Sequence, residues 1–167
     1  MPEYSDEVDR IVEAWERERP DLSFAPLQVL SRVSRLTRHL ERARRTAFAR
    51  SKLESWEFDV LSALRRAGEP YTLSPKQLLQ QTLVSSGTMT NRIDRLVASG
   101  LVERRTDPND GRGILVTMTP TGLTRVDAAI TRLVDAEAEL LQSLTATEQL
   151  RLASLLRKLS IDFDGHP

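Results

Sequence analysis

The chain has 167 residues, of which 40% are hydrophobic and 29% are charged, and it contains no cysteine. This length suits one domain, or one domain with an appended dimerisation arm. The lack of cysteine excludes disulfides, thiolate metal sites and a thiol redox switch. No run of about eighteen apolar residues and no signal-peptide pattern occurs, so we expect a cytoplasmic protein without a membrane partner.

Formal net charge is zero, but the charges are segregated along the chain. Residues 1–21 carry eight acidic and three basic side chains, whereas residues 32–52 carry eight basic and one acidic. A neutral chain has little bulk attraction to nucleic acid, because basic patches supply most nonspecific affinity. The basic run is either a local patch that attracts nucleic acid or an ordinary solvated helix face.

Two helices are expected in the first 50 residues. The first covers residues 6–17 and ends before Pro20. Its apolar residues are spaced i, i+3, i+4 and i+7: Val8, Ile11, Val12 and Trp15. A tryptophan in such a stripe most often packs in a core. The second helix covers residues 26–50, and its buried row is expected to be Leu30, Val33, Leu36, Leu40, Ala43 and Ala47.

A third helix is predicted over residues 56–67, capped by Ser55 and closed by Gly68 and Pro70. Asp59 lies off its apolar stripe, where a helical aspartate is normally solvated. The next helix begins in the capping box Ser74-Pro75-Lys76-Gln77, with proline at the first helical position, and ends before a turn at residues 82–85.

The following helix begins near Ser85 or Ser86, either of which can cap its first turn. Its apolar stripe is Met89, Ile93, Leu96 and Val97, which must face a core. At about 100° per residue, Gly87, Thr88, Asn91 and Arg95 lie furthest from that stripe, with Thr90 and Arg92 at its flanks. Small, polar and basic side chains hydrogen-bond base edges and phosphates, and a helix fits the DNA major groove. The predicted DNA-binding residues on this helix are Ser86, Gly87, Thr88, Thr90, Asn91 and Arg95.

A hairpin is predicted after Gly100, which supplies a left-handed helix stop. Residues 101–106 and 113–119 are rich in strand formers and flank the turn residues 107–111. Arg112 lies at the tip between two glycines, where it either enters the minor groove or is a stray charge on a solvated hairpin; the preceding helix favours the groove. Two short helices and a hairpin make a winged helix-turn-helix, and we assign residues 51–119 to a DNA-binding domain.

The last part of the chain predicts two more helices. Thr119-Pro120 opens the first, whose apolar residues are Leu123, Val126, Ile130, Leu133 and Leu140. After an interruption at Gln142-Ser143, a capping box of Thr145 and Glu148 opens the second, which is striped by Leu152, Leu155, Leu156 and Leu159. These leucines pack either in an intrachain hairpin or, as we expect, against a second copy. Residues 1–50 and 120–167 are therefore assigned to a helical dimerisation region, and the fold class is mainly α with a small β-hairpin.

The run SSGTMTNRIDRLVASGLVERR, followed by DPNDGRGILVTMTPTG, resembles the MarR family of bacterial transcriptional regulators, whose wing carries an Asp-x-Arg pattern matched by Asp110 and Arg112. The resemblance covers roughly the chain from Leu27 onward. It implies a regulator of double-stranded DNA that dimerises through its terminal helices, more often a repressor because a dimer on a promoter blocks access. Two recognition helices related by a two-fold axis would meet a pseudo-palindromic operator with half-sites roughly 34–36 Å apart.

Three segments, EAWERERPDLS, ESWEFDVLSALRRAGEPYTLSP and TNRIDRLVASGLVERR, resemble the urate-responsive branch of this family, which has an extra N-terminal helix. The resemblance implies a pocket for a small anion such as urate, formed by Trp15, Asp59, Arg92 and Arg104. Tryptophan can stack on a flat purine, arginine can pair with its charge and aspartate can accept from ring N–H groups. Arg105 is the alternative to Arg104, because adjacent strand residues face opposite sides. Other purines and carboxylate metabolites also act on this branch.

No enzyme activity, cofactor or metal is expected, because the chain has no Gly-rich phosphate loop and no nucleophile motif. Its two histidines, His39 and His166, are isolated in sequence. Two alternatives stay open. One is a ligand-independent or carboxylate- or phenolic-responsive repressor of the same family. The other is a helical dimerisation module without DNA binding, which would leave the polar helix face and Arg112 without a purpose.

Overall fold

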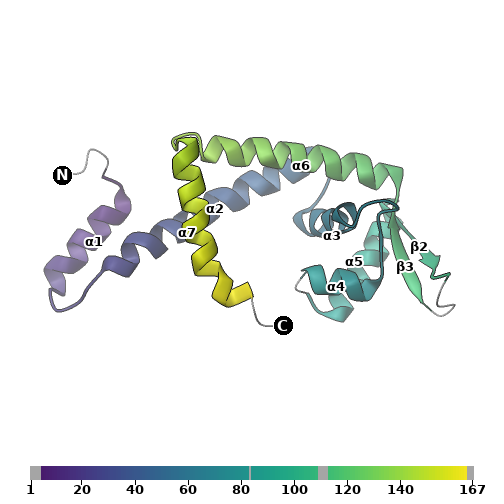
Figure 1. Ribbon diagram of the computed structural model, residues 1–167, viewed down its shortest axis with the longest axis horizontal. Coiled ribbons are helices and arrows are strands. Elements are labelled where there is room, and N and C mark those ends of the chain that lie inside the picture. The colour runs from purple at the N-terminus through teal and green to yellow at the C-terminus, as the bar shows by residue number, and fades with distance from the viewer. Residues whose placement is uncertain (1–4, 83, 109–112, 165–167) are drawn as a thin grey trace. The chain divides into compact units, whose positions relative to one another are not determined.

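The computed structural model describes residues 5–82, 84–108 and 113–164. Its elements in chain order are α1 (Glu7–Glu18), α2 (Ala25–Arg50), α3 (Ser55–Arg66), β1 (Thr72–Leu73), α4 (Pro75–Thr82), α5 (Ser86–Ala98), β2 (Val102–Thr106), β3 (Ile114–Met118), α6 (Pro120–Leu140) and α7 (Ala146–Asp164) (Figure 1). The predicted fold class, mainly α with a small hairpin, is confirmed. The chain divides into two compact units between Ala43 and Arg44, within α2.

The first unit packs α1 against the N-terminal part of α2. Asp6 caps α1, because its carboxylate accepts hydrogen bonds from the backbone N–H groups of Val8 at 2.7 Å and Asp9 at 3.1 Å. Val8 and Val12 of the predicted stripe are buried. Trp15, from the same stripe, is 50% exposed, and its ring stacks on Phe24 with 6.1 Å between the ring centroids. It therefore packs at an edge, with half of its surface open.

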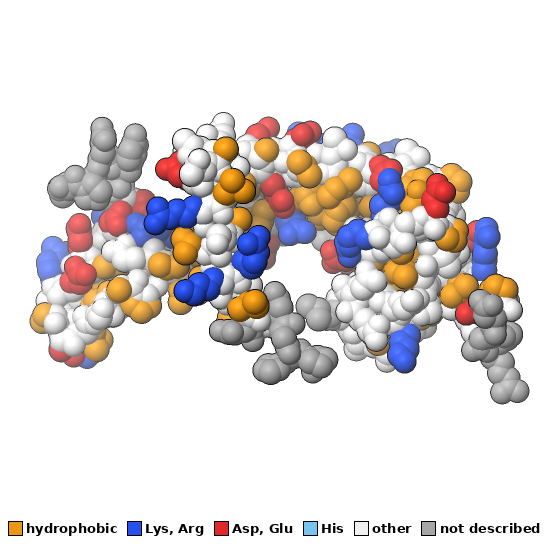
Figure 2. Space-filling model, in the orientation of Figure 1, with side chains coloured by type: hydrophobic (Ala, Val, Ile, Leu, Met, Phe, Trp, Pro, Cys, Tyr) orange, Lys and Arg blue, Asp and Glu red, His pale blue; other side chains and the backbone are white. Residues whose placement is uncertain are grey.

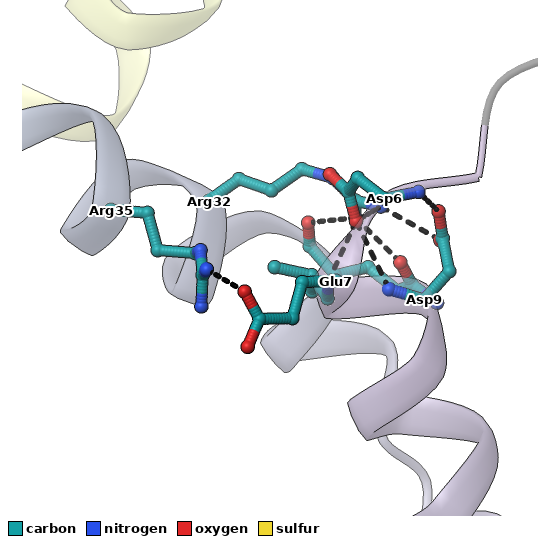
Figure 3. Close-up of polar contacts among 7 residues, drawn as sticks. Asp6, Glu7, Asp9, Arg32 and Arg35 are labelled. Atoms are coloured by element: carbon teal, nitrogen blue, oxygen red, sulfur yellow. Dashed lines mark hydrogen bonds and ion pairs between the residues drawn. The ribbon is translucent and has the colours of Figure 1, made fainter.

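Ion pairs join the two helices of this unit (Figure 3). Arg32 of α2 lies 2.8 Å from a carboxylate oxygen of Asp6 and 2.7 Å from one of Asp9, and Arg35 pairs with Glu7. The backbone N–H of Asp6 and the Arg32 guanidinium hold the pKa of Asp9 below its usual value. The acidic start of the chain thus neutralises the first two arginines of the basic run, which form ion pairs within the chain.

The predicted buried row of α2 is wrong for its N-terminal part. Leu30 and Leu36 are each 60% exposed, and Val33 is also exposed. Burial in α2 is confined to Ala47 and Phe48, where the helix enters the second unit. The helical period places Leu30, Val33 and Leu36 on one side of the helix, and within the first unit that side is exposed.

The core of the second unit lies between α3, α4, α5, the sheet and α6, and it includes Ala47 and Phe48 from the end of α2 (Figure 1). Its largest fully buried side chains include Phe48, Leu61, Leu64, Leu78, Met89, Ile93, Leu96 and Leu101. The start of α3 differs from the prediction: Glu54 rather than Ser55 is the N-cap, and the Glu57 carboxylate accepts the Glu54 backbone N–H at 2.8 Å. The first helical residue is therefore Ser55.

The sheet has three antiparallel strands in the order β1-β3-β2. The predicted hairpin is confirmed, with Val102 opposite Met118 and Thr106 opposite Ile114. The short strand β1 was not predicted, because two residues give no alternating pattern. The sheet meets α6 closely at Gly122, where an added Cβ would lie 2.2 Å from the main-chain oxygen of Leu101. Only glycine fits this contact.

The two C-terminal helices start as predicted. Thr119 caps α6 ahead of Pro120, and Thr145 exchanges hydrogen bonds with Glu148 at the start of α7. In α6, Val126 and Leu133 of the predicted stripe are buried, whereas Ile130 and Leu140 are exposed. The large hydrophobic residues of α7 are all 37% exposed or more, namely Leu150, Leu152, Leu155, Leu156, Leu159, Ile161 and Phe163. Hydrophobic side chains are correspondingly visible on the surface along α7 (Figure 2).

Candidate nucleic-acid interface

The helices α4 and α5 form the helix-turn-helix, and both have the predicted caps. The Ser74 backbone N–H donates to Gln77 Oε1 at 2.8 Å, and Ser85 Oγ accepts from the Thr88 N–H at 3.3 Å. Ser85 is therefore the N-cap of α5, which settles the choice between it and its neighbour. Gly100 ends the segment with φ +68°, in the left-handed region that favours glycine.

One side of α5 is anchored in the core. Met89, Ile93 and Leu96 are buried, as the stripe predicted, whereas Val97 at the edge of that stripe is 37% exposed. The opposite side is open to solvent. All six predicted DNA-binding residues of this helix are exposed: Ser86, Gly87, Thr88, Thr90, Asn91 and Arg95. Burial of one stripe thus presents the polar face as a fixed surface.

This polar face carries an open depression of about 380 Å³. It is lined by Trp56, Gly87, Thr88, Asn91, Arg92 and Arg95. Arg92 is half-buried and belongs to this lining, so the structure places it on the side of the predicted DNA-binding residues. The surface combines hydroxyl, amide and guanidinium groups, which are the side-chain groups that bond base edges and phosphates.

Trp56 is a member of this surface that the sequence reasoning missed. The Arg95 Cζ lies 4.5 Å from the centroid of its ring, and the Arg92 Cζ lies 5.8 Å from it. Both are within cation–π range. Trp56 comes one helical turn before Val60 of the buried stripe of α3. A tryptophan at the edge of a stripe, in the helix before a helix-turn-helix, was the available signal.

The wing adds two arginines on β2, both exposed. Arg104 Nη2 lies 2.6 Å from a carboxylate oxygen of Asp94 on α5, whereas Arg105 pairs with Glu103 on its own strand. The predicted wing-tip residues Asp110 and Arg112 lie outside the described residues. Arg104 is thus the β2 arginine that connects the wing to the recognition helix, and Asp94 is a further residue that the sequence reasoning missed.

The four predicted ligand residues fall in both units. Trp15 lies in the first unit, and Asp59, Arg92 and Arg104 lie in the second. Asp59 is exposed on α3, and among the described residues no hydrogen bond or ion pair joins it to either arginine. The charge of Arg104 is compensated by Asp94, and Arg92 lies over Trp56. The grouping of these four side chains into one pocket stays a prediction.

Within the part of the chain that the structure describes, no helix is long and apolar enough to span a membrane. The same residues include no group of three or more His, Cys, Asp or Glu side chains placed to hold a metal ion.

Comparison with known proteins identifies the family. A model of the MarR family matches residues 51–113. The HTH-type transcriptional regulator PecS of Dickeya dadantii (strain 3937) is 33% identical over 153 residues, which are 92% of this chain and 92% of PecS. A mutant MarR from E. coli, solved in complex with operator DNA, has a TM-score of 0.67 and 29% identity, with 93% of this chain and 99% of that chain covered.

A third similar protein is BpsR of Bordetella bronchiseptica, solved in a study of how 6-hydroxynicotinic acid regulates its DNA binding. Its TM-score is 0.59 and its identity 30%, with 77% of this chain and 98% of that chain covered. The relatives are transcriptional regulators, and one of them is bound to its operator. The chain belongs to the MarR family of DNA-binding transcriptional regulators.

Proposed function

We propose that this regulator is a homodimeric repressor that reads a pseudo-palindromic operator through α5. It leaves the DNA when it binds a small planar anion, such as urate or a related purine. The observation that carries the proposal is that α5 is buried on one side only. Met89, Ile93 and Leu96 are buried, and the opposite face is exposed, polar and basic. Such a helix can enter a major groove without losing any core contact.

The exposed leucines of α7 support the homodimer. Leu155 and Leu159 are each more than half exposed, and Phe163 is 84% exposed. Burial of such side chains contributes about 25 cal/mol per Å² of apolar surface, which favours a partner with a matching apolar face. A second copy supplies that face by symmetry. In this proposal residues 1–50 and 120–167 form the dimerisation region, and residues 51–119 form the DNA-binding domain.

Two observations support a planar anionic ligand. BpsR is a relative whose DNA binding is regulated by 6-hydroxynicotinic acid, a flat heteroaromatic carboxylate. In this chain Trp15 stacks on Phe24 and keeps half of its surface exposed, so a flat ligand can still reach the ring. Arg92 and Arg104 supply guanidinium groups that can pair with the ligand charge, and Asp59 supplies an acceptor for ring N–H groups.

The Asp94–Arg104 pair can couple ligand binding to the release of DNA. It joins the recognition helix to the wing strand with a separation of 2.6 Å. An anion that binds Arg104 competes with Asp94, and the contact between α5 and β2 then weakens. Because a ligand shifts an equilibrium only through its preference for one state, the anion must bind more tightly to the DNA-incompetent arrangement. By linkage, operator DNA must weaken anion binding by the same factor.

An aromatic carboxylate is the second candidate ligand, and its support is the printed regulation of BpsR by 6-hydroxynicotinic acid. The same side chains would recognise it: Trp15 would stack on the ring of the ligand, and Arg104 would pair with its carboxylate. It differs from urate in its localised charge, which suits bidentate pairing with one arginine. Measuring the affinity of each ligand in the presence of the other shows which of the two classes binds more tightly.

The experiment is a thermal-stability screen of the purified protein with urate, xanthine, 6-hydroxynicotinate and salicylate, followed by fluorescence anisotropy on DNA from the region beside its own gene. We expect one planar anion both to raise the melting temperature and to release the DNA. Trp15→Ala should weaken that response and leave operator affinity unchanged. Intact operator binding with no response to any of these compounds would reduce the proposal to a ligand-independent regulator.

A further inference from the structure

Trp56, at the start of α3, lies against the arginines of the recognition helix. The ring centroid of Trp56 is 4.5 Å from the Cζ of Arg95 and 5.8 Å from that of Arg92. The ring packs against the buried core at the same time, so it cannot move freely. It offers Arg95 a fixed flat surface, and the guanidinium can stay on that surface while one of its faces remains open to solvent.

Glu54 contacts both Trp56 and Arg95. One carboxylate oxygen accepts the Trp56 Nε1–H at 2.6 Å, and the other lies 3.5 Å from Arg95 Nη2. Glu54 is the N-cap of α3, and its own backbone N–H donates to Glu57 at 2.8 Å. The carboxylate therefore starts from a fixed backbone position. The Trp56 ring and the Glu54 carboxylate therefore both restrain Arg95.

We propose that Glu54 and Trp56 are positioning residues that hold Arg95 in its operator-reading orientation before DNA arrives. The proposal rests on the DNA-reading role of α5. A free arginine loses rotamer freedom when it binds, and a restrained one has already lost it. Arginine carries five N–H donors, so the contact with Glu54 leaves others for two bonds to a guanine edge.

The exposure of the cluster assigns it to binding rather than to folding. The side chains of Arg95 and Glu54 are 56% and 63% exposed. Ion pairs at such exposure stabilise a fold little, because water screens them. Trp56 and Arg95 instead line the open depression on the polar face of α5, beside Thr88 and Asn91. Restraint of Arg95 there lowers the cost of specific binding and gives no gain on DNA that offers no matching base.

The test is a double-mutant cycle measured by anisotropy on operator and on scrambled DNA of the same length. Trp56→Ala should weaken operator binding by about 2- to 10-fold, the ordering cost of one long side chain, and leave scrambled-DNA affinity within about twofold. Trp56→Phe, which keeps a ring face, should recover most of the loss. In an Arg95→Ala background, Trp56→Ala should have no further effect.

Glu54→Gln and its matched control separate positioning from net charge. Glu54→Gln keeps an acceptor for the Trp56 ring N–H but removes the attraction to Arg95, so the ratio of operator to scrambled affinity should fall. Glu69→Gln removes the same charge from the exposed segment after α3, where the carboxylate accepts from the Tyr71 hydroxyl, and should leave that ratio unchanged.

Three results would overturn the proposal that Glu54 and Trp56 position Arg95. The first is a Trp56→Ala effect that is equally large with and without Arg95, because Trp56 would then act through the fold or on DNA directly. The second is no change in the ratio of operator to scrambled affinity for Glu54→Gln, which carries the test if Trp56→Ala fails to fold. The third is an Arg95→Ala variant with full operator affinity, which would also remove α5 from the proposed function. The first two leave the proposed function intact, so the failures can be told apart.

Discussion

Replacement of Asp94 by asparagine tests how the wing arginine is coupled to the ligand. The Asp94 carboxylate lies 2.6 Å from Arg104 Nη2, and the side chains are 53% and 39% exposed. An ion pair at such exposure contributes about 0.2–1 kcal/mol. If the anion takes Arg104 away from Asp94, ligand binding must break this pair. Asp94→Asn should therefore tighten ligand binding by about 1.4- to 5-fold, which is the same free energy expressed as an affinity ratio.

The assay is isothermal titration of the DNA-free protein with the anion that the thermal screen selects. Glu103→Gln is the matched control, because it releases Arg105 from its own pair on β2 and leaves the Asp94–Arg104 pair in place. Tighter binding in Glu103→Gln but not in Asp94→Asn would make Arg105 the ligand residue. Binding that is unchanged or weaker in both variants would refute the idea that the anion competes for a wing arginine.

Three further predictions concern the fold and the assembly. Gly122→Ala should lower the free energy of unfolding by about 3 kcal/mol in denaturant melts, because its Cβ would lie 2.2 Å from a main-chain oxygen. Gly87→Ala is the control: its Cβ meets open space within a helix, so its free energy of unfolding should stay within about 1 kcal/mol of the wild-type value. Leu155→Glu should convert the dimer to a monomer in light scattering with no loss of helix signal, since that side chain is already 54% exposed in one chain; a persistent dimer would move the interface elsewhere. The folded-state pKa of Asp9 is below its ordinary value of 3.8, first because its carboxylate accepts the Asp6 backbone N–H and then because of Arg32. The charged Asp9 carboxylate therefore stabilises the packing of α1 above pH 3.8. This stabilisation is lost as the pH falls through the lower folded-state pKa. NMR shifts of the α1 methyl groups should follow that loss, and Arg32→Gln should diminish it.

The helix boundaries near the site were predictable because local chemistry determines them. Ser74, Ser85 and Thr119 accept hydrogen bonds from N–H groups in the first turn of their own helices, and the residues needed for that lie within a few positions in the sequence. The exposed face of α5 was equally predictable, because a 3.6-residue period assigns each side chain to a side of the helix. Those two signals are local, and they were enough to identify the recognition helix.

The features that were missed depend on contacts between distant parts of the chain. Trp56 belongs to the polar surface only because α3 packs beside α5, and no spacing within α3 reveals that neighbour. The Asp94–Arg104 pair likewise joins a helix to a strand. The exposed side of α2 shows a further limit: periodicity identifies the apolar side at Leu30 and Leu36, but it does not say whether the same chain or another one covers it.

The most direct test of the central claim is the affinity of an Asn91→Ala variant for operator DNA. Asn91 lies on the exposed face of α5, so its truncation leaves the core residues Met89, Ile93 and Leu96 in place. If α5 reads bases, anisotropy should show a loss of about 1–3 kcal/mol on the operator, with scrambled-DNA affinity and the melting temperature unchanged. Operator affinity equal to that of the wild type would contradict the assignment of this face to DNA reading.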